Sequence, residues 1–444
     1  MKPNKKDALL PPARAVALEC VNEILEHGQD LQGVLDARLR GVRISMPDAA
    51  LCTELVYGYM RLKDRIGALL GRFLKDDSKL PNKCRIAMGL AAYEMLFLDR
   101  IPVYASVDWC VNYVKRQFSQ GLGKLVNAVL RNLDRMGDEA HDMAVVTKGM
   151  PRARQLAVWY SCPEWIVEMW LDAYGEEQTL AYLTAGISSA PVGLRVNRAK
   201  PDADALVEEL AGHSDCLKRE GYSLLFPAGA APVGMKSMLA EGQISRQSFA
   251  SQEVLAVTEP QKWQGPVWDC CCGRGGKTIA LLEASVPVRY ASDTSRERLR
   301  GMREEMERLG MEPPFSLLRS ATEPVAPEVW EEIGEVAFRT ILADVPCSGL
   351  GTLSRRPDAR YHRTPEGVRD LIATQAAILD NAFAHLMTGG RLIYITCTVN
   401  PDENERQIAA FLDRTEGVTL EREWHTPQDS PYMEFFYAAM LRRA

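Results

Sequence analysis

The sequence of 444 residues lacks any apolar run of the roughly 18 residues that a membrane-spanning helix requires. Its first twenty residues, MKPNKKDALLPPARAVALEC, are basic but lack the sustained apolar core of a secretory signal. It also lacks internal repeats and low-complexity segments. We therefore expect a cytoplasmic protein with no membrane partner, and the 46% hydrophobic and 25% charged composition is typical of globular domains.

A pattern of cysteines that would bind zinc is also missing. None of the 11 cysteines belongs to a C-x-x-C pair, and the run Cys270–Cys271–Cys272 lacks zinc-site spacing. In the cytoplasm these thiols are expected to be reduced. The sequence therefore predicts no metal site and no disulfide framework.

An excess of positive charge is the third absence. The net charge of −6 argues against a protein coated with basic side chains for bulk nucleic-acid binding. The first 140 residues nevertheless carry 21 Lys and Arg against 17 Asp and Glu, whereas the remainder is acidic. This asymmetry favours the N-terminal part as the contact surface for an anionic partner.

Apolar periodicity predicts a multidomain chain. Residues 12–136 read as helices, with Leu18, Val21 and Leu25 at helical spacing, and indicate an all-α bundle in residues 1–140. Residues 141–240 are expected to hold a linker, over about 136–151, and a small α+β subdomain. Residues 241–444 alternate strands with helices, which is typical of a doubly wound α/β sheet.

Within this last part we place strands at 266–270, 288–292, 315–318, 340–343 and 391–395. One predicted helix covers 295–309 and stops at Gly310. Another covers about 365–387, with Thr364 as its N-cap and Gly389–Gly390 at its end.

The segment from Trp268 to Thr278, WDCCCGRGGKT, joins a predicted strand to a helix. Its glycines permit close backbone approach, and the helix that follows favours an anionic group at its N-terminus. Asp293 ends the next strand, where an acid can accept hydrogen bonds from ribose hydroxyls, although it can equally cap the following helix. Loop and acid together favour an adenosine-containing cofactor over a merely tight turn.

Two cysteines follow neighbouring strands. The segments DVPCSGLG and YITCTVNP place Asp344, Cys347 and Cys397 at the carboxyl ends of strands, where open α/β sheets bind ligands. A single free cysteine is more often an inert buried side chain. One reaction that can use two thiols beside a carboxyl group is the methylation of cytosine at carbon 5. Carbon 5 becomes nucleophilic only after a thiolate adds to carbon 6, and a base must then remove the carbon-5 proton. Two thiols and a carboxyl group meet these needs.

These motifs resemble those of the RsmB/Sun family of RNA cytosine-5 methyltransferases. The resemblance implies that Cys397, in the Thr-Cys motif, is the nucleophile, that Cys347, in the Pro-Cys motif, assists product release, and that Asp344 is the catalytic carboxyl group. DNA cytosine-5 methyltransferases use the Pro-Cys thiol instead, with a later Glu-Asn-Val motif. Glu403–Asn404–Glu405 does not match that motif, so the RNA family fits better.

The resemblance covers about residues 12–444. LVYGYMRLKDRI, YEMLFLDRIP and LVNAVLRNLDR resemble a NusB-like helical domain, and EFFYAAMLRR resembles the family's closing strand. The family implies a Rossmann-like methyltransferase fold that uses S-adenosylmethionine. Its cofactor residues map to Cys271, Cys272, Gly273, Arg274, Gly275, Gly276, Lys277, Asp293, Arg298, Ser320 and Asp344. Cys272, Gly273 and Arg274 replace the family's Ala-Ala-Pro, and Ser320 stands where it usually has Asp.

The resemblance implies an enzyme that acts on small-subunit (16S) rRNA, and we expect the protein to be a monomer. Arg355 and Arg356 are candidates for holding RNA phosphates, although they can equally be solvated surface residues. Two alternatives remain: the same chemistry on another RNA such as tRNA, and a non-catalytic ribosome-assembly factor with a degenerate cofactor pocket.

Overall fold

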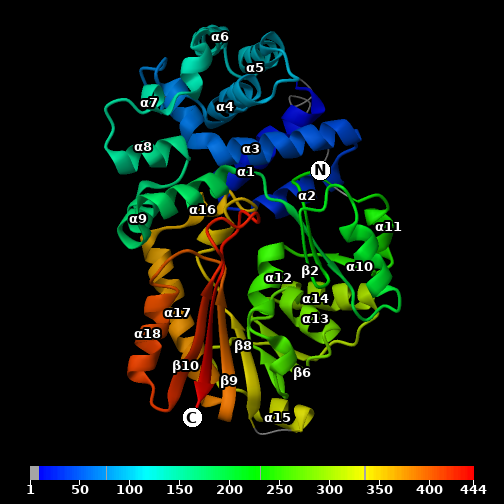
Figure 1. Cartoon of the computed structure of the whole chain (residues 1–444). Helices are drawn as coiled ribbons and strands as arrows, with labels where there is room; N and C mark the ends of the chain where they lie inside the picture. Colours follow the sequence, from blue (N-terminus) through cyan, green and yellow to red (C-terminus); the bar gives the residue numbers. More distant parts are fainter. Residues whose placement is uncertain (1–9, 77, 231, 335–336) are drawn as a thin grey trace. The chain divides into compact units, whose positions relative to one another are not determined.

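The computed structural model describes residues 10–76, 78–230, 232–334 and 337–444 (Figure 1). The chain forms two compact units. The first, called the helical unit, comprises Met1–Ser188 and Leu353–Arg363. The second, called the sheet unit, comprises Ser189–Thr352 and Thr364–Ala444. The chain therefore passes from one unit to the other three times.

The helical unit is built from amphipathic helices around one apolar core. Side-chain caps start several of them: Asp30 accepts a hydrogen bond from the backbone N–H of Gly33, and Ser45 does so from Asp48. The helices are α1 (Pro12–His27), α2 (Leu31–Gly41), α3 (Met46–Gly71), α4 (Asn82–Phe97), α5 (Val103–Gln117), α6 (Gln120–Arg135), α7 (Met143–Val146), α8 (Arg152–Trp159) and α9 (Glu164–Ile187). The prediction of a helical bundle is confirmed.

The stretch 136–151, predicted to be a linker, is instead part of this core. It contains a 3₁₀ helix, Gly137–His141, followed by α7. Ala140 is completely buried and Val146 nearly so, and both pack in the apolar cluster of the helical unit. Two small apolar side chains in a polar stretch give no periodicity, which explains why the sequence pattern did not reveal it. The boundaries at residues 140 and 240 remain predictions.

The segment Leu353–Arg363, including α16 (Ala359–His362), belongs to the helical unit although it follows a strand of the sheet unit. Arg360 is 1% exposed, and its guanidinium donates to the carbonyl oxygens of Tyr160 and Ser161, each at 3.0 Å, and of Gly186 at 2.5 Å. The segment is thus held by specific polar contacts in the helical core.

The sheet unit begins with a small four-stranded antiparallel sheet in the order β2-β3-β1-β4. Two helices accompany it, and the cluster of apolar side chains between them includes Leu194, Val207 and Phe226. The elements are β1 (Val192–Val196), α10 (Ala203–Ala211), β2 (Lys218–Glu220), β3 (Ser223–Phe226), α11 (Met235–Ala240) and β4 (Ile244–Arg246). The predicted small α+β part is therefore present.

A seven-stranded sheet follows, in the order β10-β11-β9-β8-β5-β6-β7. The strands are β5 (Val267–Asp269), β6 (Val288–Asp293), β7 (Phe315–Leu318), β8 (Phe338–Asp344), β9 (Leu386–Thr396), β10 (Val418–His425) and β11 (Tyr437–Arg443). β5 to β9 pair in parallel, and β11 is antiparallel to both β9 and β10. This is the Rossmann-like arrangement that the alternating pattern predicted.

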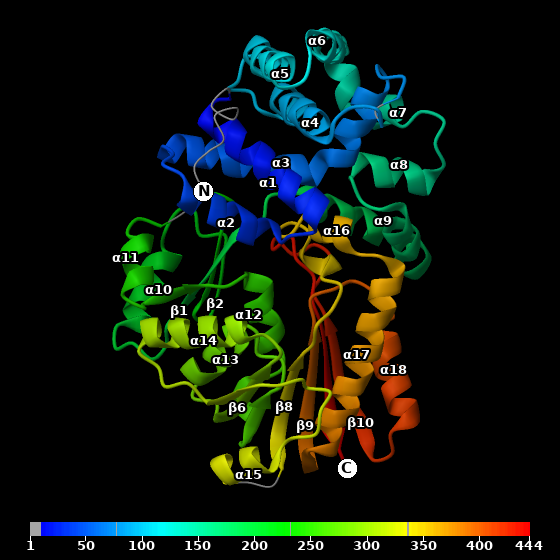
Figure 2. The same cartoon turned by 180° about the vertical axis from the view of Figure 1, so that it is seen from behind.

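Helices cover both faces of this sheet (Figures 1 and 2). Apolar residues of α15 (Pro327–Ile333), α17 (Pro365–Ala384) and α18 (Glu405–Arg414) pack on one face around Trp268 and Tyr290. The other face is covered by α12 (Phe249–Ala256), α13 (Gly276–Glu283) and α14 (Arg296–Leu309). Helices bury both faces of the parallel strands, which is why these strands appear in the sequence as continuous apolar runs.

One predicted boundary is wrong. Helix α17 ends at Ala384 rather than near Met387, and Gly389–Gly390 lie within β9. Leu386 already pairs with Phe338, and the register then shifts, with Arg391 opposite Thr340. The glycines therefore accommodate an irregular strand, where Gly389 has a φ of 74°, instead of ending the helix.

Candidate active site

Two neighbouring parallel strands bring the two predicted thiols together. β8 ends at Asp344 and β9 at Thr396, with Asp344 opposite Ile395. The Sγ atoms of Cys347 and Cys397 are 3.4 Å apart, and the backbone N–H of Cys397 points to Cys347 Sγ at 3.4 Å. Two half-buried thiols in contact can exchange or share a proton, which neither achieves alone.

The environment of Cys347 favours its protonated form. The hydrogen bond with Cys397, burial, and the charges of Cys397 and Glu403 together raise the pKa of the Cys347 thiol well above its usual range. A thiol that stays protonated is a poor nucleophile.

A buried ion pair lies beside these thiols. Lys277 Nζ is 2.7 Å from Asp344 Oδ2, and the lysine side chain is only 8% exposed. Burial alone would lower the pKa of Lys277, but the Asp344 carboxylate and, after it, Cys397 outweigh burial and raise it. The ammonium group therefore stays charged, fixes the Asp344 carboxyl group, and favours negative charge at Cys397.

The glycine-rich loop between β5 and α13 is held by the predicted acid. Asp293 Oδ2 accepts a hydrogen bond from the Gly273 N–H at 3.0 Å, and its Oδ1 accepts one from the Ser295 N–H at 2.7 Å. Gly275 has a φ of 81°, and a Cβ there would lie 2.4 Å from the Met302 side chain. Asp293 thus fastens the loop and the start of α14 together.

The same residues pass a test of fit for an adenosine cofactor. Each carboxylate oxygen has two lone pairs, so Asp293 retains one on each oxygen for a pair of ribose hydroxyls. A Cβ built on Gly273 meets nothing within 4 Å, so the loop backbone borders open space. Cys271, Cys272, Gly276 and Lys277 complete the loop and the first turn of α13.

Three other residues predicted to bind the cofactor form polar contacts of their own. Arg274 is exposed and forms an ion pair with Glu297 at 2.9 Å, so in this structure it points along the surface of α14. Arg298 lies 3.7 Å from Asp293. The hydroxyl of Ser320 is 2.8 Å from that of Thr322. Arg274 therefore does not crowd the loop here.

Arg355 and Arg356 are not in the same unit as the thiols. Both belong to the segment Leu353–Arg363 of the helical unit, where Arg356 is 3.4 Å from Asp30. Arg356 is exposed and Arg355 is half-buried. Their role as RNA contacts remains a prediction.

Gly351 ties the Cys347 loop to the Cys397 loop. Its N–H donates to the Cys397 carbonyl oxygen at 3.1 Å, and its own carbonyl accepts from the Phe435 N–H at 2.8 Å. A Cβ on Gly351 would lie 2.0 Å from the Phe435 oxygen and 2.9 Å from the Cys397 oxygen. Only glycine fits this close approach of three backbone segments.

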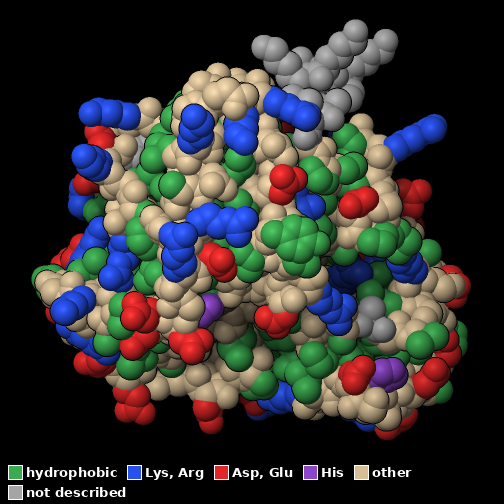
Figure 3. Space-filling view, turned by 90° about the horizontal axis from the view of Figure 1, so that it is seen from above, with side chains coloured by type: hydrophobic (Ala, Val, Ile, Leu, Met, Phe, Trp, Pro, Cys, Tyr) green, Lys and Arg blue, Asp and Glu red, His purple; other side chains and the backbone are tan. Residues whose placement is uncertain are grey.

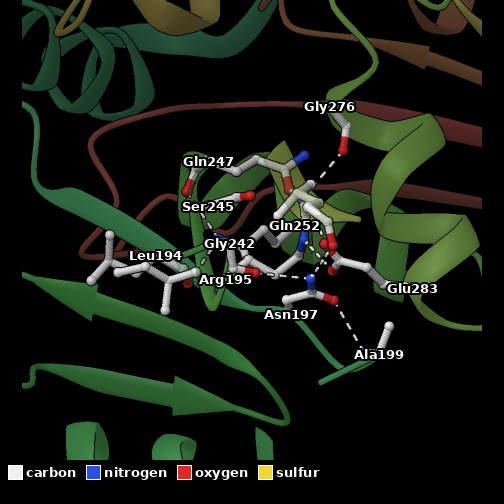
Figure 4. A network of polar contacts seen from close by, with 12 residues as sticks. Leu194, Arg195, Asn197, Ala199, Gly242, Ser245, Gln247, Gln252, Gly276 and Glu283 are labelled. Carbon is white, nitrogen blue, oxygen red and sulfur yellow. Dashed lines mark hydrogen bonds and ion pairs between the residues drawn. The ribbon is translucent and has the colours of Figure 1, made fainter. Parts of the chain in front are cut away.

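A polar network joins the small sheet to the cofactor loop (Figure 4). Arg195 on β1 forms a two-pronged ion pair with Glu283, at 2.7 and 3.1 Å, and both side chains are buried. The same guanidinium donates to the Gly276 carbonyl at 3.2 Å and contacts Gln247. The first turn of α13, which carries Lys277, is therefore held from the small sheet.

Replacement of Arg195 with methionine is expected to lower the free energy of unfolding of the sheet unit by about 3–5 kcal/mol, because Glu283 stays buried without its partner. The double variant Arg195→Met/Glu283→Leu should recover most of this loss. Denaturant unfolding of the two variants measures the difference. Equal losses in the single and double variants would contradict an uncompensated charge as the cause.

Sequence reasoning missed two of these residues. Arg195 was not singled out, although a lone arginine in an apolar strand signals a buried partner. Glu403 was considered only as part of a motif that failed to match, yet its side chain is completely buried near Cys347. In neither case does the sequence identify the side chains that the residue contacts, because most of them come from distant parts of the chain.

The chain is similar to known protein families over most of its length. The pattern of the family "16S rRNA methyltransferase RsmB/F" matches residues 254–440, that of the NusB family matches 11–135, and that of the RsmF/B-like ferredoxin-like domain matches 162–216. Ribosomal RNA small subunit methyltransferase B of Vibrio vulnificus is 31% identical, over 97% of this chain and 99% of its own. The chain belongs to the ribosomal RNA small subunit methyltransferase B family. The resemblance drawn from the motifs is confirmed.

One further relative and two solved structures are also similar to this chain. The probable ribosomal RNA small subunit methyltransferase B of Synechocystis is 30% identical, over 94% of this chain and 92% of its own. The crystal structure of PH0851 shares the fold over 98% of this chain and 99% of its own, with a TM-score of 0.74 at 20% identity. A methyltransferase homolog protein from Pyrococcus horikoshii matches 66% of this chain and 100% of its own, with a TM-score of 0.56 at 24% identity.

No helix within the described residues is both long and apolar enough to cross a membrane. Nor does the described part of the chain contain a group of three or more His, Cys, Asp or Glu side chains that could hold a metal ion.

Proposed function

We propose that this protein transfers a methyl group from S-adenosylmethionine to carbon 5 of a cytosine in small-subunit rRNA. The observation that carries the proposal is the contact of Cys347 and Cys397 at 3.4 Å, beside the Lys277–Asp344 ion pair. A methyl transfer to a nitrogen or oxygen atom requires no such pair of thiols. The substrate class follows the names of relatives that match nearly the whole chain.

In the reaction, Cys397 Sγ forms a bond to carbon 6, and the ring electrons shift so that carbon 5 becomes nucleophilic. Asp344, oriented by Lys277, binds the N3/N4 edge of the base, and the neighbouring Lys277 ammonium group stabilises the negative charge that develops. S-adenosylmethionine, when bound, supplies the electrophilic methyl group. After transfer, solvent water accepts the carbon-5 proton, the electrons of that C–H bond restore the double bond, and Cys397 leaves as a thiolate. Cys347 assists this release.

The cofactor would be held by the loop residues Cys271 to Lys277 and by Asp293, which supports the loop at Gly273. Arg298 and Ser320 are the remaining predicted contacts. The loop supports this assignment because its backbone borders open space while an acid with spare lone pairs lies beneath it.

RNA binding is assigned to the helical residues 1–140 and to Arg355 and Arg356. Lys and Arg side chains stand out over much of the face seen in Figure 3, with Asp and Glu between them. Basic groups on a mixed surface suit contacts to RNA phosphates that position the substrate without reading its sequence. We further propose that the protein acts as a monomer in the cytoplasm.

The test is methyl transfer from S-adenosylmethionine to small-subunit rRNA that lacks its modifications, with tRNA in parallel, followed by nucleoside mass spectrometry. The proposal requires 5-methylcytosine in the rRNA and none in tRNA. If 5-methylcytosine forms only in tRNA, the substrate assignment fails. If the protein binds rRNA but methylates neither RNA, a non-catalytic assembly factor is the better description.

A further inference from the structure

Glu403 is a buried acid next to the two thiols. Its side chain is completely inaccessible, and both carboxylate oxygens accept hydrogen bonds. Oε1 accepts from the Ser348 N–H at 2.8 Å and from Gln375 Nε2 at 3.0 Å. Oε2 accepts from Asn400 Nδ2 at 3.0 Å and from the Ser348 hydroxyl.

These contacts indicate the ionised form of the acid. Three N–H groups and one hydroxyl donate to these oxygens, a set of donors that stabilises a carboxylate over the protonated acid. No Lys, Arg or His in the described part of the chain forms an ion pair with Glu403, so neutral donors alone stabilise its charge. A buried charge is costly, and one kept without a countercharge at a reaction centre points to a use there.

The network joins the loops that carry both thiols. Ser348 immediately follows Cys347, and Gln375 also donates to the carbonyl of Pro346, at 3.0 Å, so Glu403 acts on both sides of that cysteine. The Ser348 and Thr398 hydroxyls are 2.7 Å apart. The residue after each thiol is thus linked to the same carboxylate, Ser348 directly and Thr398 through the Ser348 hydroxyl.

Charges of opposite sign also lie near the two thiols. Lys277 interacts with Asp344 first and with Cys397 after it. The groups that act on Cys347 are Cys397 and Glu403, and Tyr394 is a further titratable neighbour. A cation next to one thiol and an anion next to the other give them different protonation states.

We propose that Glu403 is a positioning residue of the methyl-transfer reaction, which holds the two cysteine loops in register and disfavours negative charge at Cys347. Cys397 is thereby left as the thiolate and Cys347 as the proton-carrying thiol. This inference rests on the proposed function. Nothing in it requires Glu403 to touch the base, in contrast to the glutamate of the Glu-Asn-Val motif in DNA methyltransferases.

The test uses the full chain with Glu403→Gln and, as matched control, Asp402→Asn. The control removes the same charge from the adjacent exposed residue, whose side chain pairs with Arg406. Initial rates of alkylation by iodoacetamide are measured against pH, and peptide mass spectrometry resolves Cys347 from the other cysteines. Turnover on rRNA is measured alongside.

For Glu403→Gln we expect the Cys347 alkylation midpoint to fall by about one pH unit or more and turnover to fall at least about tenfold. For Asp402→Asn we expect neither change. A folded Glu403→Gln protein whose Cys347 midpoint equals that of the wild type would overturn the electrostatic role. Alkylation needs no RNA, so this result is independent of whether the wild type methylates any RNA.

The variant Glu403→Asp distinguishes the electrostatic role of Glu403 from its positioning role. It also provides the test if the glutamine variant does not fold. The shorter side chain keeps the charge but cannot span the same donors. We expect a Cys347 midpoint near that of the wild type and a turnover lowered by about tenfold with little change in KM. Wild-type turnover in this variant would overturn the positioning role.

Discussion

Replacement of Cys397 with alanine is expected to abolish 5-methylcytosine formation, a loss on the order of 10⁴-fold or more. The reason is that no other group described near the site can add to carbon 6. Cys347 lies 3.4 Å away, but its environment keeps it protonated. Scintillation counting of labelled methyl groups in rRNA measures the loss.

The variant Cys347→Ala is expected to be defective in product release, the last step of the reaction. Without the second thiol, release of the methylated base slows, and we expect a covalent protein–RNA adduct that resists denaturing electrophoresis. Cys216→Ala is the matched control, because Cys216 is a half-buried thiol that packs against the apolar cluster of the small sheet and does not follow β8 or β9. An adduct in Cys397→Ala and none in Cys347→Ala would reverse the two roles.

The second large effect is expected for Gly351→Ala. The new Cβ would lie 2.0 Å from the Phe435 carbonyl oxygen, so the loop after Cys347 must move away from the Cys397 loop. Because a displacement of about 1 Å at reacting groups can cost about 10²-fold, we expect turnover to fall by about 10²-fold with both thiols still present.

Gly367→Ala serves as the control for this substitution. Gly367 lies in the first turn of α17, and a Cβ there would approach only Thr364 Oγ1, at an ordinary 3.5 Å. Steady-state kinetics on rRNA compare the two variants. Unchanged turnover in Gly351→Ala would show that the register of the two loops does not limit the reaction.

Much of the fold could be read from the sequence because its signals are local. The strand at Phe315–Leu318 is found as predicted, and α14 runs from its cap at Ser295 to the left-handed Gly310. The edge strand β10, by contrast, was not predicted. In its mostly exposed residues Val418–His425 the apolar alternation is interrupted at Arg422, and pairing with β11 makes them a strand.

The residues of the site likewise include some that a local sequence signal predicts and some that it does not. Motif residues such as Asp344, Cys347 and Cys397 follow strands directly, so their convergence followed from topology. Glu403 acquires its meaning only from Ser348 and Gln375, which come from distant parts of the chain. Likewise, the assignment of Arg355 and Arg356 to the helical unit depends on long-range packing that no local pattern encodes.

The most direct test of the covalent mechanism uses rRNA that carries 5-fluorocytidine, together with S-adenosylmethionine and the wild-type protein. Fluorine at carbon 5 cannot be removed as a proton, so the adduct stays trapped, and peptide mass spectrometry identifies the linked residue. The account predicts RNA attached to Cys397. Attachment to Cys347, or methyl transfer without any trapped adduct, would contradict it.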